Sequence, residues 1–289
     1  MNGDQAMDIR YYYKSNCDNL NKKAHFSCPL SYRIVDILGK ILPFVLPSGR
    51  SFLPGYKPFP GEQKEIIEQI IEKINTIQKQ IDWNQNIHEA SYVVFDTETT
   101  GLYPLQGDRV ISLSGVMIEN GKLQENLFFN ELVNPLRSIP PAIAELTGIN
   151  NALVSGKPTF LQVLQRFLDF IGNRILVAHC AAFDLSFINI ELCRFTPLRI
   201  VNPVVDTYLL SKSLFPHINH YSLESLAEKY NVEIIGRHTS LGDSLATAQL
   251  FLNLLQALKA KGINSLEELV LFTDFHKLNN DSPGMLKHF

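Results

Sequence analysis

The residues that could do chemistry in this sequence are carboxylates at the ends of predicted elements. Asp96 and Glu98 stand two residues apart at the end of the apolar stretch 92–95, which we expect to be a strand. Alternation along a strand places both side chains on the same face. A buried pair of like charges is costly without a cation, and hard oxygen ligands at this spacing suit Mg²⁺ or Mn²⁺. Taken alone, the pair is more simply explained by a solvated strand end followed by a turn.

Two more acids and a histidine follow later in the chain. Asp184 comes after the apolar stretch 175–178 and opens a predicted helix, while Asp243 lies in the first turn of the last long helix. His238 stands five residues before Asp243, in the preceding loop. Each is ordinary alone, because an acid near a helix N-terminus complements the helix dipole. All five together, each at the edge of a predicted element, indicate a metal-dependent site.

Hydrophobic periodicity predicts the elements that must position these residues. The predicted strands are 92–95, 110–118, 123–133, 175–178 and 204–205, with a hairpin at Asn120-Gly121. The predicted helices are 141–146, 160–171, 181–195, 207–214, 223–230 and 241–261. A meander followed by strand–helix alternation favours an α/β fold, with a mixed sheet and helices on both faces.

We expect three segments: an N-terminal extension over 1–88, a central domain over 89–262, and a C-terminal helix and tail over 263–289. The extension is expected to be mainly helical, because seven isoleucines form a stripe in a predicted helix at about 63–81. Such a stripe must dock on the central domain, on residues 1–60 or on a second subunit; a small separate domain with 1–60 is favoured. The polar stretch 84–89 is interpreted as a linker.

Composition describes an ordinary globular protein, with 45% hydrophobic and 19% charged residues and a net charge of −3. That charge is not the strongly basic balance of a protein that holds nucleic acid by charge alone, although bound metal would neutralise several of the acids. No apolar stretch is long enough to span a bilayer, and no secretory signal opens the chain. We therefore expect a soluble, cytoplasmic protein without membrane contact. The four cysteines include no Cys-x-x-Cys pair, which argues against a zinc ribbon.

The order Asp, Glu, Asp, His, Asp resembles the DEDDh group of 3′–5′ exonucleases in the ribonuclease H-like superfamily. The sequence is most similar to the epsilon-type proofreading exonucleases of bacterial DNA polymerase III. Supporting matches are Asn134-Pro135, Leu146-Thr147-Gly148-Ile149 and Asp206-Thr207, and the resemblance covers about residues 91–261. One departure is Cys180, where the family often has asparagine. The resemblance implies a ribonuclease H-like mixed five-stranded sheet flanked by helices.

The resemblance also implies a mechanism. Asp96, Glu98, Asp184 and Asp243 would hold two divalent cations, Mg²⁺ or Mn²⁺, and His238 would be the general base. The substrate would be DNA with a free 3′ end, preferably single-stranded, degraded to nucleoside 5′-monophosphates in proofreading or repair. The expected substrate-binding residues are Thr97, Thr99, Gly101, Leu102, Thr147, His179 and Phe183. For Phe183, a core position is the simpler interpretation.

Several alternatives remain open at this point. An RNA or oligoribonucleotide 3′–5′ exonuclease of the same group would carry the same catalytic set. A catalytically silent module that binds nucleic acid or a polymerase is disfavoured, because it would not need mutually repelling carboxylates. A DNA polymerase subunit or a sliding clamp is a candidate partner. The stretch 268–272 faintly resembles a clamp-binding peptide, although an amphipathic closing helix explains the same residues.

Overall fold

The computed structural model describes residues 61–78, 82–196 and 198–280. Residues 1–60, which form most of the expected N-terminal extension, lie outside these ranges. From Ile66 onward, the described residues belong to one compact unit.

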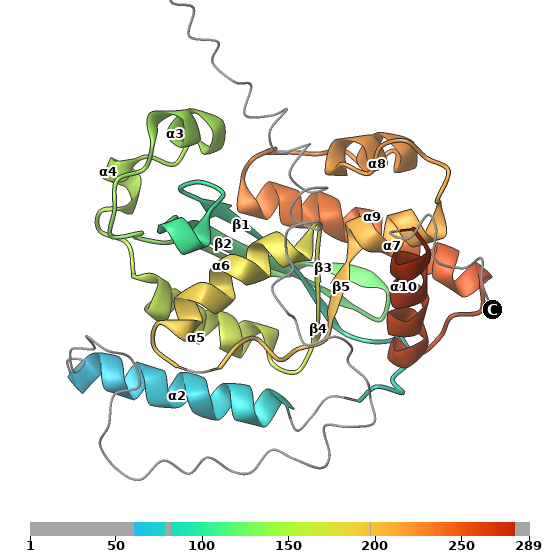
Figure 1. Ribbon diagram of the computed structural model, residues 1–289, viewed down its shortest axis with the longest axis horizontal. Coiled ribbons are helices and arrows are strands. Elements are labelled where there is room, and N and C mark those ends of the chain that lie inside the picture. The colour runs from blue at the N-terminus through green and yellow to red at the C-terminus, as the bar shows by residue number, and fades with distance from the viewer. Residues whose placement is uncertain (1–60, 79–81, 197, 281–289) are drawn as a thin grey trace, which may run out of the picture. The chain divides into compact units, whose positions relative to one another are not determined.

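The central element is a five-stranded mixed sheet, which confirms the predicted fold class (Figure 1). Its strands are β1 (Tyr92–Thr99), β2 (Val110–Glu119), β3 (Lys122–Leu132), β4 (Ile175–Ala178) and β5 (Val204–Asp206). Their order is β3-β2-β1-β4-β5, with antiparallel pairing among β1, β2 and β3 and parallel pairing of β4 with β1 and β5. The helices are α2 (Gly61–Gln78), α3 (Pro141–Thr147), α4 (Asn151–Val154), α5 (Phe160–Ile171), α6 (Ala181–Cys193), α7 (Thr207–Leu214), α8 (Leu223–Tyr230), α9 (Ser240–Ala260) and α10 (Leu266–Asn280), with a 3₁₀ turn η1 (Pro104–Gln106).

The predicted hairpin between β2 and β3 is confirmed. Asn120 and Gly121 have φ angles of 49° and 69°, so both occupy the left-handed region. Asparagine and glycine are the residues that adopt this conformation at least cost in a two-residue hairpin.

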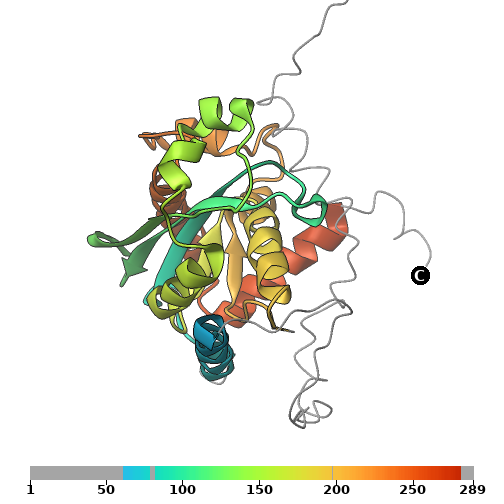
Figure 2. The same ribbon diagram turned by 90° about the vertical axis from the view of Figure 1, so that its left-hand side faces the viewer.

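Helices cover both faces of the sheet (Figure 2). On one face α9 packs along the strands, and the ring of Phe251 lies 4.9 Å from that of Tyr92 on β1. On the other face lie α5 and α6, and the ring of Phe167 on α5 is 6.0 Å from that of Phe95. Because neighbouring strand residues point to opposite faces, β1 directs Asp96 toward the α9 side and Thr97 toward the α6 side.

The isoleucine stripe of α2 lies against the compact unit. Ile70 and Ile74 are fully buried, and Lys73 on the same helix forms an ion pair with Asp169 of α5, with Nζ 2.6 Å from Oδ1. Lys73 also reaches the carbonyl oxygen of Gln165, at 3.5 Å. These contacts support docking of the helix on the central domain, one of the alternatives left open by the sequence, while the domain boundary at residue 88 stays a prediction.

The stretch interpreted as a linker is a packed segment, so that interpretation was wrong. Ile87 is fully buried, and its N–H donates to the carbonyl oxygen of Asn264 at 2.8 Å. The ring of His88 contacts the Ile263 carbonyl oxygen at 3.0 Å. The polar side chains of this segment form local turns and contact residues far along the same chain. Composition alone cannot distinguish such a segment from a solvent-exposed linker.

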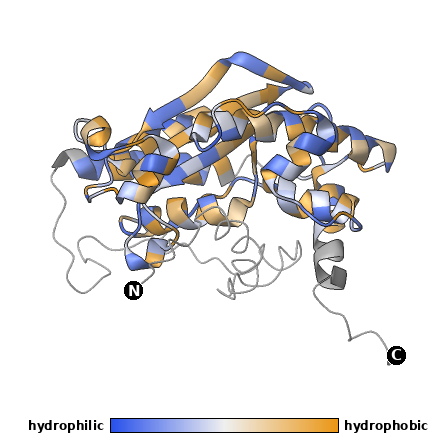
Figure 3. Cartoon of the chain, turned by 90° about the horizontal axis from the view of Figure 1, so that it is seen from above, coloured by the Kyte–Doolittle hydropathy of each residue, from blue (hydrophilic) through white to orange (hydrophobic). Residues whose placement is uncertain are grey.

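The C-terminal helix α10 packs on the hydrophobic core next to this segment. Leu266 and Leu269 are buried, whereas Leu271 is exposed. The stretch that resembles a clamp-binding peptide is therefore part of an amphipathic closing helix. In Figure 3, polar and apolar residues alternate along the helices, as expected where one face is buried. Within the described ranges, no helix combines the length and apolar character that a membrane span requires.

Candidate active site

Three of the predicted acids converge at the end of β1. Asp96 and Glu98 on β1 and Asp243 in the first turn of α9 place carboxylate oxygens within 4.8 Å of one another. Asp184, in the first turn of α6, is close enough for its charge to raise the pKa of Asp96. The structure thus gathers at one site the four carboxylates that the sequence predicts.

Burial and mutual repulsion make these acids hard to ionise. Burial is the main cause of a pKa well above the usual range at Asp96, and the charges of Asp184 and Asp243 add to it. Burial, followed by the charge of Asp243, raises the pKa of Glu98 to about 8. Burial also raises the pKa of Asp243 to about 6, although Arg237 opposes the shift. Such a set is stabilised in its ionised form by a cation.

The donor set fits a hard divalent cation. All the converging ligand atoms are carboxylate oxygens, the chemistry that Mg²⁺ and Mn²⁺ prefer. Oδ1 of Asp243 is buried without a hydrogen-bond partner among the described residues. Buried polar atoms are normally paired, so an unpaired carboxylate oxygen on a residue of this cluster suits a metal ligand.

Thr97 holds Asp184 in place. Its backbone N–H and its hydroxyl both donate to Oδ1 of Asp184, at 2.9 and 2.6 Å, and its side chain is buried. Burial raises the pKa of Asp184 to about 7, and the two bonds from Thr97 oppose that rise. The structure shows that Thr97 supports this acid, and its predicted contact with the substrate stays a prediction.

The turn from β4 to α6 leads into the first helical turn, which carries Asp184. Cys180 caps α6 in the left-handed conformation, with φ 62° and ψ 48°, and its N–H donates to Oδ1 of Asp206 at 3.1 Å. The same carboxylate oxygen accepts the N–H of Tyr208 at 2.9 Å. Asparagine tolerates left-handed backbone better than most residues, so it would adopt this conformation at lower cost than Cys180 does.

The loop before α9 is pressed against the first turn of that helix. The hydroxyl of Thr239 accepts the N–H of Gly242 at 3.1 Å and donates to the Gly236 carbonyl oxygen at 2.6 Å. A Cβ at Gly242 would lie 2.8 Å from the carbonyl carbon of Gly236, and closer still to two carbonyl oxygens. His238 has a φ of 62°, and its backbone hydrogen-bonds the Asp243 carboxylate. This packing fixes the candidate general base beside a candidate metal ligand.

Arg237 is a site residue that sequence reasoning missed. Its Nη1 pairs with Oδ2 of Asp243, while Nε and Nη2 donate to Oε1 of Glu224 on α8 at 2.8 and 2.6 Å. Burial would raise the pKa of Glu224, but the Arg237 guanidinium outweighs it and brings the pKa to about 2. The available signal was an arginine next to the predicted base, in a site where four like charges require a counter-charge.

The loop after β1 contains three predicted nucleotide contacts. The hydroxyl of Thr99 donates to the carbonyl oxygen of Gly101 at 2.5 Å. A Cβ at Gly101 would lie 2.7 Å from Cγ of Asp108, so the backbone passes close to that side chain. Gly101 and Leu102 are half-buried next to the acids. Their contact with a terminal nucleotide stays a prediction.

The remaining predicted contacts are held by protein partners. Nδ1 of His179 lies 2.9 Å from the Thr207 hydroxyl, and burial is the main cause of a His179 pKa lowered to about 4. Thr147 is buried and donates to the Ile143 carbonyl oxygen at 2.9 Å. Phe183 is half-buried and packs on the buried Phe187, with ring centroids 5.1 Å apart. The substrate contacts of these residues stay predictions.

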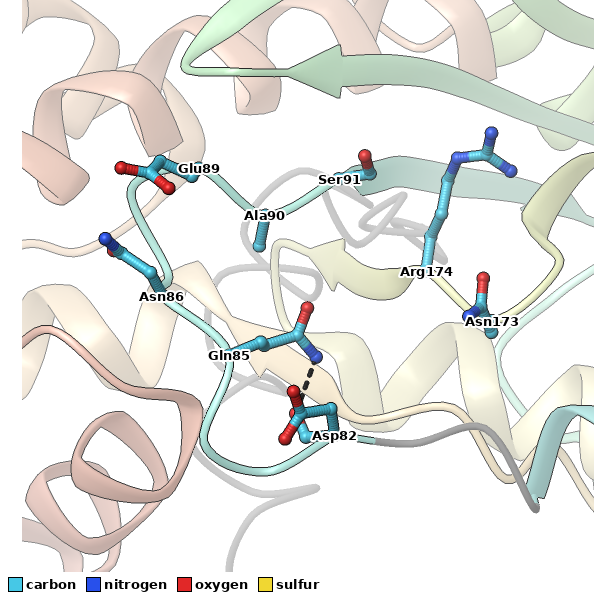
Figure 4. A pocket seen from close by; sticks show the side chains of 8 residues that line it. All are labelled: Asp82, Gln85, Asn86, Glu89, Ala90, Ser91, Asn173 and Arg174. Carbon is cyan, nitrogen blue, oxygen red and sulfur yellow. Dashed lines mark hydrogen bonds between the residues drawn. The ribbon is translucent and has the colours of Figure 1, made fainter.

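A hollow lies away from the acids, at the opposite ends of β1 and β4 (Figure 4). It is lined by residues just before those strands, including Glu89, Asn173 and Arg174, and Gln85 donates to the Asp82 carbonyl oxygen at 2.8 Å. Over the part of the chain that the structure describes, only the group at Asp96, Glu98 and Asp243 places three metal-ligating side chains so close together. The chemistry therefore belongs to the acid cluster.

Comparisons with known proteins agree with this geometry. The exonuclease family model (RNase_T) matches residues 93–251. A DNA polymerase III subunit epsilon from Aquifex aeolicus is 36% identical over 180 residues, which cover 62% of this chain and 88% of that protein. An epsilon-like protein from Rhodobacter capsulatus is 41% identical over 181 residues, which are 62% of this chain but only 26% of that protein.

A solved structure gives the same result for the fold. Exonuclease X, in complex with 5′ overhanging duplex DNA, is 26% identical with a TM-score of 0.50, covering 63% of this chain and 99% of that one. The family match spans more than half of the chain, and the mixed sheet agrees with the ribonuclease H-like fold that the sequence predicts. The chain therefore belongs to the exonuclease family, and the predicted resemblance to its epsilon-type members is confirmed.

Proposed function

We propose that this chain is a divalent-metal-dependent 3′–5′ exonuclease that hydrolyses DNA to nucleoside 5′-monophosphates. The observation that carries the proposal is the convergence of Asp96, Glu98 and Asp243 within 4.8 Å, with Asp184 beside them. Four acids gathered in one site, three of them buried and Asp96 half-buried, are costly to maintain, and the phosphodiester chemistry of the family supplies the reason to keep them.

The chain's own residues divide the work in this proposal. Asp96, Glu98, Asp184 and Asp243 would hold Mg²⁺ or Mn²⁺, and Thr97 keeps Asp184 oriented. Divalent cations supply charge stabilisation for the attacking and leaving oxygens of an in-line displacement. His238 accepts the proton of the attacking water as the general base, from its position in the loop packed against Asp243.

DNA is the proposed substrate because of the relatives. Two of them are named as DNA polymerase III epsilon or epsilon-like proteins, and exonuclease X was solved with DNA. We propose by the same reasoning that the chain works with a polymerase, in proofreading or repair. A terminal base must leave its stack to reach the buried acids, which favours single strands and frayed ends.

The test uses purified full-length protein on matched single-stranded DNA, duplex DNA and RNA, each labelled at either the 5′ or the 3′ end. With Mg²⁺ or Mn²⁺, the 3′ label should be released first as a mononucleotide, and 5′-labelled strands should shorten progressively. EDTA and Asp96→Asn should both abolish the reaction. Cleavage of circular DNA, full activity in EDTA, or faster degradation of RNA than of DNA would contradict the proposal.

A further inference from the structure

The side chain of Arg237 connects the buried acid cluster to the surface. Its guanidinium contacts Glu224 through Nε and Nη2, at 2.8 and 2.6 Å, and pairs with Asp243 through Nη1. The side chain of Glu224 is 52% exposed, whereas that of Asp243 is 6% exposed. One end of the guanidinium is therefore anchored at the rim, and the other reaches a buried metal-ligating carboxylate.

The pairing with Asp243 conflicts with metal binding. Oδ2 of Asp243 is occupied by Nη1, while Oδ1 has no hydrogen-bond partner among the described residues. A divalent cation among Asp96, Glu98 and Asp243 would repel a guanidinium a few ångströms away, and burial strengthens that repulsion. Arg237 also favours the ionised forms of Asp96 and Glu98, so it provides positive charge to the whole cluster.

We propose that Arg237 is an internal counter-cation, which a divalent metal ion must displace from Asp243, and that Glu224 retains the displaced side chain at the rim of the site. This inference rests on the proposed metal-dependent function. Before the metal binds, the positive charge of Arg237 reduces the repulsion among the four acids. Because the metal must displace it, the metal affinity is lower than the acids alone would give. It is a positioning residue, because its direct contacts are with the carboxylates rather than with the substrate.

The test is isothermal titration of Mn²⁺ into metal-stripped full-length protein, without nucleic acid. The variants are Arg237→Gln, Arg237→Lys and a matched control, Arg166→Gln, which removes a guanidinium paired with Glu131 on the surface. Loss of a charge-assisted hydrogen bond to Asp243 should lower the Kd of Arg237→Gln by on the order of 10- to 100-fold. Arg237→Lys should fall between it and wild type, because one ammonium cannot hold Glu224 and Asp243 together. The control should match wild type.

A second readout separates competition from a structural role. In EDTA, Arg237→Gln should unfold at a lower temperature than wild type, and Mn²⁺ should raise its midpoint more than that of wild type. Unchanged or weaker Mn²⁺ binding by both Arg237 variants, with native circular dichroism, would overturn the inference. If Arg237→Gln does not fold, Arg237→Lys decides in the same way. Wild-type protein that does not bind Mn²⁺ at all would overturn the proposed function as well, whereas normal wild-type binding without tightening would overturn only the role of Arg237.

Discussion

Gly242→Ala is predicted to damage the site although it should improve the helix. Gly242 lies in the first turn of α9, where alanine is favoured over glycine by about 1 kcal/mol. The added Cβ would, however, lie 2.8 Å from the Gly236 carbonyl carbon. The neighbouring atoms are backbone, so they cannot rotate away as a flexible side chain would.

The expected magnitude follows from that distance. Restoring ordinary van der Waals separation requires the loop to retreat by roughly 1 Å, at an overpacking cost of about 1–3 kcal/mol. The movement also strains the cap in which Thr239 bonds both Gly242 and Gly236, worth about 1 kcal/mol. After subtracting the gain in helix propensity, we expect a net loss of about 1–3 kcal/mol. Because the loop carries His238, the rate should fall by about 100-fold, the cost of a misplacement of this size.

Urea unfolding and single-turnover hydrolysis of DNA at saturating Mn²⁺ measure the two effects. The matched control is Gly156→Ala, where a Cβ meets no atom within 4 Å; it should stay within about 0.5 kcal/mol of wild type and keep its rate. Wild-type stability and rate in Gly242→Ala would refute the packing argument. Lower stability with an unchanged rate would show instead that the loop does not position His238.

Further changes test other parts of the site. Asp184→Asn should abolish hydrolysis yet raise the unfolding temperature in EDTA at pH 8, because the amide oxygen still accepts the Thr97 bonds without adding charge; normal turnover would argue against a ligand role. His238→Ala should lower the rate by about 10²–10⁴-fold with little change in Mn²⁺ affinity, and a parallel collapse of metal binding would contradict its role as a base. The folded pKa values of Glu98, about 8, and Asp243, about 6, lie above the unfolded values, so the folded protein binds more protons. The stability that these two groups contribute in EDTA, measured by urea unfolding, should therefore be fully present below about pH 4 and be lost as the pH rises toward 8, and saturating Mn²⁺ should reverse the slope; stability that rises between about pH 5 and pH 8 in EDTA would exclude this linkage. Ile74→Ala should cost about 2–5 kcal/mol in the unfolding of the whole compact unit, and a separate early transition of α2 would show an independent domain.

Local signals in the sequence predicted most of the scaffold. Helix α5 begins after Thr159 with a reciprocal capping box, and α8 begins after Ser222, whose hydroxyl accepts an N–H of the first turn. Elements with such ends, and with a clear apolar period, agree with prediction nearly residue for residue. The four-residue helix α4 was missed, because so short a segment has no period to detect.

Long-range pairing was the part that the sequence could not provide. The types of the acidic residues and their order in the sequence were enough to predict that they form one site. They did not show that Arg237 lies between Asp243 and Glu224. The same limit applies to Thr97, whose buried hydroxyl meets a helix 87 positions further along the chain. A polar residue next to a catalytic motif suggests a substrate contact, and only the fold shows that its hydroxyl donates to a buried acid.

The place of α9 in the chain has a consequence during synthesis. This helix packs on β1 and β2 and contributes Asp243, while the loop just before it contributes His238. Proteins are made and begin to fold from the N-terminus, so β1 emerges with two of the acids well before α9, and the last acid follows only with that helix. Under the proposed mechanism, a nascent or prematurely ended chain lacks both the last ligand and the base. Translation therefore yields a nuclease only when the domain is nearly complete, and fragments of it pose no hazard to nucleic acid.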